Sequence, residues 1–574
     1  MNDFRNISQG KQIPREQYSD QPYVVIADNR DWVCVITTVK GDEGARGEHI
    51  GITRSADKGD SWTPLLFLEN AQEPESAYGV LLKVPYGRIY CFYNFNKDDV
   101  RFIESSEGLH HRVDMQGYFV FRFSDDHGVT WSDRYEVPVR ETKVDRNNAY
   151  QGKIRLFWTV GKPLLIRDSC YFPIHKIQDM LTVSEGWFIH SPNIGVEKEV
   201  SKLIFETLPD GEEGLKTPEG GGLIAEEQSI VSISDGSLYC VYRTVDGHPA
   251  YSISRDGGHT FSKPQYQAYA DGRLMKNPRA ANFIWKLKNG KFLYWFHNNG
   301  GRWYENRNPV FVSSGIEADT DKGKTIKWSQ PELILYDRDP YTIISYPDFI
   351  EDGNRFYITE TMKTEARCHE IKEEFMINLL NQFDNADVSK RGLLMEYESS
   401  DGGKLIMPDL PYFTEREVVN STYNSKNLGH GLTIEMWCEF KEKVNRQILF
   451  DSRDKNHKGI LIETNLNHGV SIVLNDGLMQ CSWQSDDEVL RVNSTHHIAV
   501  VIDGGPRIIS FIIDGRYNDG GEVREFGFGR FSPYFREANG AQTAEVSASA
   551  RVVKIYGVAL MTSEVIGNYN HDKI

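Results

Sequence analysis

The sequence predicts an all-β protein, a six-bladed β-propeller followed by a β-sandwich. Three observations carry this prediction: a hairpin-like pattern recurs six times, a second short turn recurs three times, and the strand pattern restarts near residue 429. A chain of 574 residues is too long for one ordinary hydrophobic core, which favours two domains. Its 49 glycines and 12% aromatic residues favour short strands joined by tight turns.

The most regular repeat is a polar turn followed by an aromatic and β-branched run. Each run follows another apolar run, so each pair is typical of a β-hairpin. Intervals of roughly 55 to 80 residues between the hairpins are typical of propeller blades, which close radially and leave little exposed edge. We therefore expect the propeller to span residues 1–385. The six runs are Asn29–Ile36, Tyr86–Phe92, Asp168–Phe172, Asp235–Val241, Asn289–Trp295 and Asp352–Ile358.

The pattern changes after the sixth hairpin. Apolar residues between 365 and 385 have helical spacing, which predicts a helix that braces the propeller. Residues 386–428 are expected to form a linker or bracing segment. From about residue 429 alternating apolar strands return, which predicts a β-sandwich over residues 429–574.

Charge and composition exclude several classes of function. The net charge of −17 argues against a nucleic-acid or anionic-membrane partner, because phosphates are held by clustered Lys and Arg. An anionic sugar stays compatible with this charge, since a few arginines in a cleft can oppose it locally. The seven cysteines lack metal-ligand spacing and four of them lie inside apolar strands, so no metal and no cofactor is expected.

No apolar run approaches the length of a membrane span, and the N-terminus has no apolar signal region. The chain is expected to be cytoplasmic, or secreted or periplasmic if a leader has been removed. The sequence carries no signal for an oligomeric state.

The second repeated turn has the form Ser-x-Asp-x-Gly-x-Ser/Thr-aromatic and occurs at residues 55–62, 124–131 and 254–261. In such a turn the Asp side chain accepts hydrogen bonds from nearby backbone N–H groups, Gly adopts a left-handed conformation and the aromatic ring is buried. The motif resembles the Asp-box, or BNR repeat, of sialidase-like β-propellers. The C-terminal strands at 432–437, 496–500, 511–515 and 553–560 resemble laminin-G or concanavalin-like domains, which implies a glycan-binding or a structural role.

In a propeller the first strands of the blades converge on the axis, so their starting ends line one funnel. These ends hold charges and hydroxyl groups where packing alone would require aliphatic residues. We expect the six strands to open at residues 19–23, 75–78, 150–153, 225–228, 277–279 and 345–348.

The sialidase resemblance is closest in the last three blades. The segment from Glu226 to Arg243 resembles the one that holds a catalytic glutamate and a carboxylate-binding arginine, which implies these roles for Glu227 and Arg243. The segment 306–314 resembles the second-arginine strand and nominates Arg307. Tyr346 stands where sialidases carry a nucleophilic tyrosine. A neutral phenol, with Glu227 as its base, avoids the repulsion that an anionic sugar would exert on a carboxylate nucleophile.

Other candidates come from loops and strand ends. The leaving-group acid is expected in the loop 41–49, where Asp42 has roughly the family position and Glu48 and His49 are neighbours able to act in its place. Sialidases also open with an arginine that anchors the sialate carboxylate, and here that strand reads Asp20-Gln21-Pro22. Its loss disfavours true sialidase activity, because an Asp would repel the anion. Arg279, Arg302 and Lys153 are candidates to supply the missing charge.

Three functions of different class follow. The first is a retaining exo-glycosidase that acts on a terminal acidic or deoxy sugar of a glycan. The second is a polysaccharide lyase or rhamnose-releasing enzyme, in which His49, His175 or His297 removes a proton from a uronate-containing substrate. The third is a non-catalytic glycan-binding protein.

Overall fold

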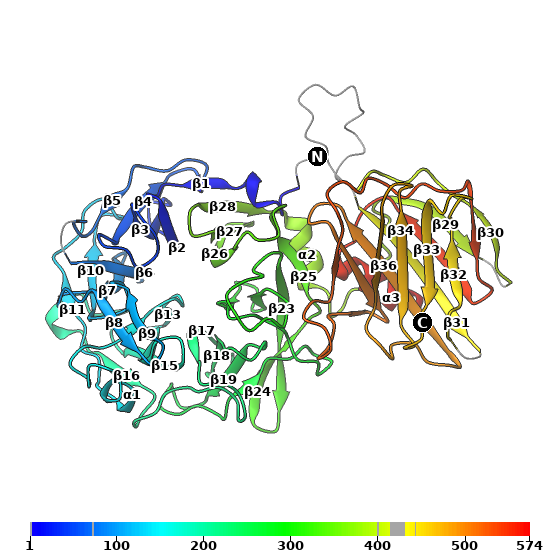
Figure 1. The fold of residues 1–574 in the computed structure, drawn as a ribbon. Coiled ribbons are helices and arrows are strands. Elements are labelled where there is room, and N and C mark those ends of the chain that lie inside the picture. The colour runs from blue at the N-terminus through cyan, green and yellow to red at the C-terminus, as the bar shows by residue number, and fades with distance from the viewer. Residues whose placement is uncertain (1–2, 72–73, 399–400, 414–430, 442–443, 574) are drawn as a thin grey trace.

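The computed structural model describes residues 3–71, 74–398, 401–413, 431–441 and 444–573. Within these ranges six antiparallel sheets of four or five strands are formed by residues between 11 and 371. Figure 1 shows the six sheets around a common centre, with the C-terminal strands in a separate body beside them. The predicted all-β architecture of a propeller followed by a sandwich is confirmed.

Each propeller sheet begins with a strand near the centre and proceeds outward through antiparallel neighbours (Figure 1). The first sheet contains β2 (Tyr18–Ile26), β3 (Trp32–Val39), β4 (His49–Ser55) and β5 (Leu66–Phe67). The second contains β6 (Ser76–Lys83), β7 (Ile89–Phe95), β10 (Tyr118–Ser124) and β11 (Tyr135–Glu136). The third contains β12 (Phe157–Trp158), β13 (Leu164–Ile166), β14 (Ser169–Asp179), β15 (Val183–Ser191) and β16 (Glu206–Leu208).

The remaining three sheets follow the same plan. The fourth contains β17 (Glu226–Ser232), β18 (Leu238–Arg243), β19 (Ala250–Ser254) and β20 (Gln265–Tyr266). The fifth contains β21 (Phe283–Lys286), β22 (Phe292–Phe296), β23 (Val310–Thr320), β24 (Gly323–Trp328) and β25 (Glu332–Leu335). The sixth contains β26 (Ser345–Asp352), β27 (Arg355–Thr361), β28 (Ala366–Ile371) and the N-terminal β1 (Lys11–Ile13). Because β1 pairs with β28, the two ends of the propeller segment share one sheet.

All six hairpin-like runs coincide with the second strands of the sheets, which are β3, β7, β14, β18, β22 and β27. The three Asp-containing turns lie between the third and fourth strands of the first, second and fourth sheets. In the first of them the Asp57 carboxylate accepts hydrogen bonds from the backbone N–H and the hydroxyl group of Ser61, and Ser55 Oγ accepts one from Gly59 N–H. These turns are therefore structural.

Three expectations about the propeller segment are wrong. Residues 277–279 do not open a strand, because the first strand of the fifth sheet, β21, begins at Phe283. Residues 150–153 form turns, and the first strand of the third sheet is β12 at Phe157–Trp158. Residues 366–371 form strand β28, because pairing with β27 and β1 outweighs their local helical spacing. The helix follows as α2 (Glu373–Leu380), whose Phe375, Met376 and Leu379 are buried in the propeller core. α1 (Lys143–Arg146) and two 3-10 turns (Ile7–Gln9 and Val200–Lys202) complete the helical elements of this segment.

The C-terminal body is a sandwich of two antiparallel sheets and one helix, α3 (Thr562–Asp572). One sheet contains β29 (Leu393–Glu398), β31 (Leu432–Phe440), β36 (Ser494–Asp503), β37 (Ile508–Ile513), β38 (Arg516–Tyr517), β39 (Gly529–Arg530) and β41 (Ala550–Tyr556). The other contains β30 (Gly403–Ile406), β32 (Ile448–Asp451), β33 (Gly459–Thr464), β34 (Val470–Asn475), β35 (Gln480–Gln484) and β40 (Thr543–Val546).

The segment 386–428, expected as a linker, contributes a strand to each sandwich sheet, because β29 pairs with β41 and β30 pairs with β40. The boundary expected between 428 and 429 lies outside the described residues. Apolar side chains of the fifth propeller sheet and of the first sandwich sheet form one hydrophobic cluster, which includes Phe311, Trp328, Val501 and Ile512. The two bodies are therefore joined by a continuous core.

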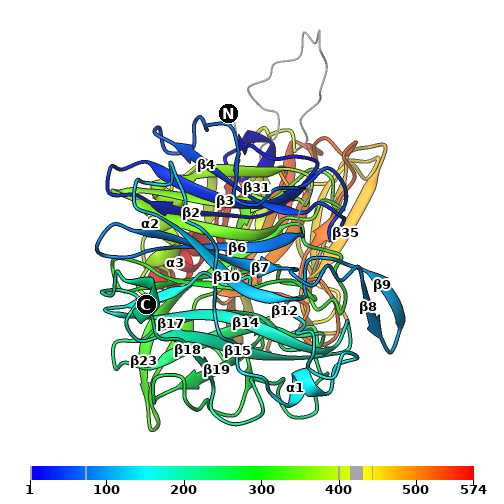
Figure 2. The same cartoon turned by 90° about the vertical axis from the view of Figure 1, so that its left-hand side faces the viewer.

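Figure 2 shows the propeller sheets as successive layers and the hairpin of β8 (Phe102–Ser105) and β9 (Gly108–His111), which projects from the second sheet. None of the described helices is both long enough and apolar enough to cross a membrane.

Candidate active site

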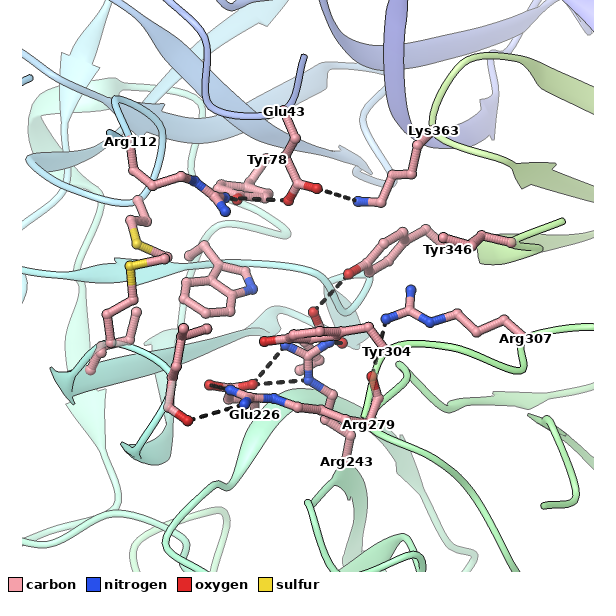
Figure 3. A pocket seen from close by; sticks show the side chains of 17 residues that line it. Glu43, Tyr78, Arg112, Glu226, Arg243, Arg279, Tyr304, Arg307, Tyr346 and Lys363 are labelled. Carbon is pink, nitrogen blue, oxygen red and sulfur yellow. Dashed lines mark hydrogen bonds and ion pairs between the residues drawn. The ribbon is translucent and has the colours of Figure 1, made fainter. Parts of the chain in front are cut away.

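A cavity of about 320 Å³ lies at the inner ends of the propeller sheets, and Figure 3 shows the side chains that line it. Five cationic, three carboxylate, three phenolic and six apolar side chains line this space. The charged and phenolic residues are Arg112, Arg243, Arg279, Arg307, Lys363, Glu43, Glu226, Glu227, Tyr78, Tyr304 and Tyr346, and the apolar ones are Met115, Trp158, Ile177, Met180, Leu181 and Ile343. The cavity thus differs in charge from the strongly acidic chain as a whole.

Tyr346 and Glu227 form a buried hydrogen-bonded pair in this cavity. The phenol of Tyr346 on β26 donates to Glu227 Oε1 on β17 over 3.0 Å, although the residues are 119 positions apart. Both residues are buried, with exposed fractions of 7% and 2%. A phenol and a carboxylate at this distance form the nucleophile and base arrangement that covalent catalysis requires.

The backbone that carries these two side chains is irregular. Tyr346 and Glu227 have φ values of 47° and 57°, and the strand register shifts at both positions. Tyr78 on β6 and Gln21 on β2 share this conformation at the corresponding points of their strands, with φ values of 58° and 52°. A bulge with a left-handed residue redirects a side chain and carries local strain, and it is common beside functional sites.

Burial sets the protonation of the pair. Burial raises the pKa of Glu227 above its ordinary value of 4.5, and the neighbouring Glu226 carboxylate adds to this effect while Arg243 opposes it. Burial and the Glu227 carboxylate also raise the pKa of Tyr346 above 10. The phenol is therefore neutral in the free protein, and its proton must pass to a base as it reacts.

Glu226 holds two of the arginines. Its carboxylate accepts hydrogen bonds from Arg243 Nε and Nη2 at 2.9 and 2.6 Å, and Arg279 Nη2 lies 3.4 Å from its other oxygen. Burial alone would raise the pKa of Glu226, but these guanidinium groups lower it to about 2. Arg243 Nη1 also forms a 2.8 Å ion pair with Glu227 Oε2, so Arg243 bridges the two carboxylates.

Arg307 differs from the other cavity arginines. It donates to Ser345 Oγ at 2.9 Å and to the Arg279 carbonyl at 3.0 Å, and its Nε has no hydrogen-bond partner. Among the residues that the structure describes, Arg307 forms no ion pair with a carboxylate. The ring of Tyr304 lies 4.8 Å from the Arg279 guanidinium and 5.8 Å from those of Arg243 and Arg307. Tyr304 therefore contacts all three of these arginines, Arg243, Arg279 and Arg307, which together are called the arginine cluster (Figure 3).

Lys363 supplies a cation on the opposite side of Tyr346. Its ammonium lies 2.6 Å from Asp20 Oδ2, 3.4 Å from Glu43 Oε2 and 4.4 Å from the centre of the Tyr346 ring. Against the effect of burial, the two carboxylates raise the pKa of Lys363 above its ordinary value. Glu43 also lies 3.3 Å from Arg112. Desolvation alone would raise the pKa of Glu43, but Lys363 and Arg112 lower it to about 2.

The structure brings together five of the sequence-predicted site residues, Tyr346, Glu227, Arg243, Arg279 and Arg307. Asp20 and Gln21 are buried behind the cavity, where Asp20 pairs with Lys363 and Gln21 donates to the Thr159 carbonyl. Asp42 is exposed on its loop and does not line the cavity, whereas its neighbour Glu43 does. The expectation that Asp42 lies among the cavity residues is therefore wrong, and in its loop Glu43 takes that place.

The three candidate histidines also do not line the cavity, because each is buried in the packing around it. His49 contacts the ring of Phe67 and lies 3.2 Å from Glu16. His175 packs against Trp158 and its Nδ1 accepts the backbone N–H of Glu227 at 3.2 Å. Burial lowers the pKa of His175 to about 3 and that of His297 well below 6.5, so both are neutral.

Sequence reasoning did not select four charged or phenolic residues that line the cavity, Glu43, Lys363, Tyr304 and Glu226. Glu43 lies within the nominated loop and Glu226 lies within the nominated segment, so a weaker signal existed for both. Tyr78 belongs to the segment 75–78, where a strand was expected to open into the funnel. Lys363 and Tyr304 come from turns without a repeated motif, and no signal in the sequence selects them.

No protein-family model and no curated protein matches the sequence. Similar solved structures include a Dyadobacter fermentans protein of unknown function, with a TM-score of 0.46 and 14% identity over 63% of this chain and 97% of that chain. Trypanosoma rangeli sialidase is similar with a TM-score of 0.44 and 10% identity over 97% of this chain and 94% of that chain. A mutant of the NanB sialidase of Streptococcus pneumoniae has a TM-score of 0.44 and 13% identity over 63% and 70%. At such low identities and TM-scores we infer neither activity nor substrate from these likenesses.

Proposed function

We propose that this protein is a retaining glycoside hydrolase that removes a terminal anionic sugar from a glycan. The observation that carries the proposal is the buried Tyr346–Glu227 pair, 3.0 Å apart in a cavity that Arg307 also lines, without a carboxylate partner among the described residues. Tyr346 is the proposed nucleophile, Glu227 its base and Arg307 the principal anion-binding group. The sialidase-like sequence motifs around these residues agree with this assignment.

The proposed reaction has two steps. In the first, the Tyr346 oxygen bonds to the anomeric carbon, its proton passes to Glu227, and the leaving oxygen departs as it takes a proton from an acid. In the second, water bonds to the anomeric carbon and gives a proton to the acid's conjugate base. The bond to Tyr346 breaks as the bond to water forms, and the phenol recovers its proton from Glu227. Two displacements at one carbon give net retention of configuration.

Glu43 is the proposed acid, because its carboxyl group lies in the cavity. In the free protein Lys363 and Arg112 keep it ionised. A bound anionic sugar would oppose these cations and raise the pKa of Glu43 toward the range in which it can donate a proton.

Glu43→Gln is expected to slow cleavage of substrates with alkoxide leaving groups by about a hundredfold, and aryl glycosides much less, because a phenolate leaves without protonation. Asp42→Asn is the matched control, since Asp42 is exposed, and it should retain wild-type rates on both substrates. The reverse ranking of the two variants would return the acid role to Asp42.

The lyase alternative is disfavoured by the surroundings of the three histidines. Elimination needs a base that reaches the carbon-bound proton of the sugar, and in the described part of the chain no histidine lines the cavity. His175 Nδ1 already accepts a hydrogen bond from Glu227 N–H.

A panel of aryl glycosides with sialate, other ulosonate, uronate and rhamnose as the terminal sugar tests the proposal. Release of the aryl group with a reducing sugar from one or more anionic members is the expected result. A new ultraviolet chromophore from a uronate substrate would indicate elimination instead. Cleavage confined to rhamnose would show that the terminal sugar need not be anionic. Binding without product would favour a glycan-binding protein.

The activity should depend on pH through Glu227. Glu227 accepts the phenolic proton only when it is ionised, so activity is lost as pH falls through its pKa. Because burial raises that pKa, the acidic limb of kcat/KM should lie above 4.5, the ordinary value for a glutamate. A pH–rate profile measures this limb, and Glu227→Gln should remove it along with most of the activity. A limb at or below 4.5 would exclude Glu227 as the base.

A further inference from the structure

A loop of the sandwich contacts the propeller loop that carries Tyr304. The sandwich loop is residues 518–527, between β38 and β39, and the propeller loop is residues 299–306, between β22 and β23. The two pair as antiparallel backbone between Asn299 and Phe526, and Gly300 N–H donates to the Glu525 carbonyl at 2.9 Å. The Glu525 side chain also accepts from Asn306 Nδ2 at 2.9 Å. The sandwich thus contacts both ends of the propeller loop.

These contacts lie at the two ends of the propeller loop, Asn299 and Asn306, which are called its neck. Asn299 Nδ2 donates to the Asn306 carbonyl at 2.8 Å, which closes the loop between its two ends. Tyr304 lies between these ends, and its ring contacts the guanidinium groups of Arg243, Arg279 and Arg307. A shift of the neck would therefore move Tyr304 relative to the arginine cluster.

The sandwich loop is itself fixed to the propeller by a buried lysine. Lys276, which is 3% exposed, donates from Nζ to the carbonyl oxygens of Asp519 and Arg524 at 2.8 and 2.6 Å. Arg273 adds a 3.1 Å ion pair with Asp519. These contacts hold the Glu525 end of the sandwich loop at the propeller surface. Lys276 is three positions in sequence from the cavity residue Arg279.

We propose that the sandwich completes the active site through this loop, and that Glu525 is a positioning residue that holds Tyr304 over the arginine cluster. The proposal rests on the proposed function for its kinetic consequence, because Tyr304 shapes the wall that binds the anionic sugar. Loss of the contact would free Tyr304 and weaken substrate binding while leaving the Tyr346–Glu227 pair unchanged. The expected kinetic effect is therefore a higher KM with kcat nearly constant.

The test uses the full chain and four variants. Glu525→Ala removes the side-chain contact to Asn306, and Glu525→Gln keeps an acceptor oxygen at the same place. Glu522→Ala is the matched control on the same loop, since that side chain is 74% exposed and its carboxylate lies 3.6 Å from His248, which is outside residues 299–306. Lys276→Met removes the ammonium that fixes the loop carbonyls. Amide hydrogen exchange of residues 299–306, melting temperature and steady-state kinetics are measured for each.

In Glu525→Ala, exchange in residues 299–306 and KM are each expected to rise about 2- to 12-fold, the range for one lost hydrogen bond, at unchanged melting temperature. Glu525→Gln should restore both values, Glu522→Ala should match the wild type, and Lys276→Met should act in the same direction as Glu525→Ala. Wild-type exchange in both Glu525→Ala and Lys276→Met would overturn the proposed contact. Faster exchange with unchanged KM would overturn the positioning role. If the wild type cleaves nothing, the proposed function fails, and the exchange data still decide whether the sandwich holds the loop.

Discussion

Tyr346→Phe is expected to lower turnover by at least about a thousandfold, because it removes the oxygen proposed to bond to the anomeric carbon. The change deletes one buried hydrogen bond to Glu227, which costs about 1 kcal/mol and should leave the protein folded. Steady-state kinetics on the best substrate of the aryl glycoside panel measures the loss, and circular dichroism measures the fold.

Tyr341→Phe is the matched control for this substitution. Tyr341 lies five positions away and is 88% exposed, so its hydroxyl group should not affect turnover. Full activity in Tyr346→Phe would exclude Tyr346 as the nucleophile. Equal losses in both variants would show that the effect does not come from the cavity.

Arg307→Met is expected to raise KM for an anionic sugar by about 10- to 150-fold, the range for lost hydrogen bonds to a charged group. Arg307 is the cavity arginine without a carboxylate partner in the described residues, so its charge is free to pair with the substrate. A neutral sugar of the same shape should lose much less. Isothermal titration or inhibition by the free sugar acid measures the same difference without turnover.

Arg302→Met serves as the control, because Arg302 is an exposed residue between the same two strands, β22 and β23, and does not line the cavity. Equal losses for the anionic sugar and its neutral analogue in Arg307→Met would mean that Arg307 shapes the cavity and does not bind the anion.

The repeating strands of the propeller could be predicted from the sequence because each hairpin has its own turn and apolar run. All six second strands were located in this way. The first strand of the third sheet, β12, was missed because it has two residues and lacks an alternating pattern. Strand β28 was missed because its hydrogen-bond partners, β27 and β1, lie at opposite ends of the propeller segment.

The candidate site was predictable where a side chain follows a recognisable strand. Tyr346, Glu227, Arg243 and Arg307 belong to such segments, and all four line the cavity. The bulges at Tyr346 and Glu227 depend on cross-strand register, which a single sequence does not display.

The remaining site residues depend on loop geometry. Lys363 reaches the cavity from the turn after β27 and pairs with Asp20 from the first sheet, 343 positions away. This cation lies beside the strand that lacks the sialidase-like arginine. The sequence alone predicts that Asp20 repels an anion, because its lysine partner is found only when the first and sixth sheets are placed side by side.

The proposed reaction depends on a covalent bond between Tyr346 and the sugar. Its most direct test is mass spectrometry of peptides from the protein after incubation with an activated, fluorinated analogue of the best terminal sugar, which slows the second step. The expected result is one added sugar on Tyr346, absent from Tyr346→Phe. A sugar attached to any other residue, or a first product of inverted configuration without any adduct, would exclude Tyr346 as the nucleophile.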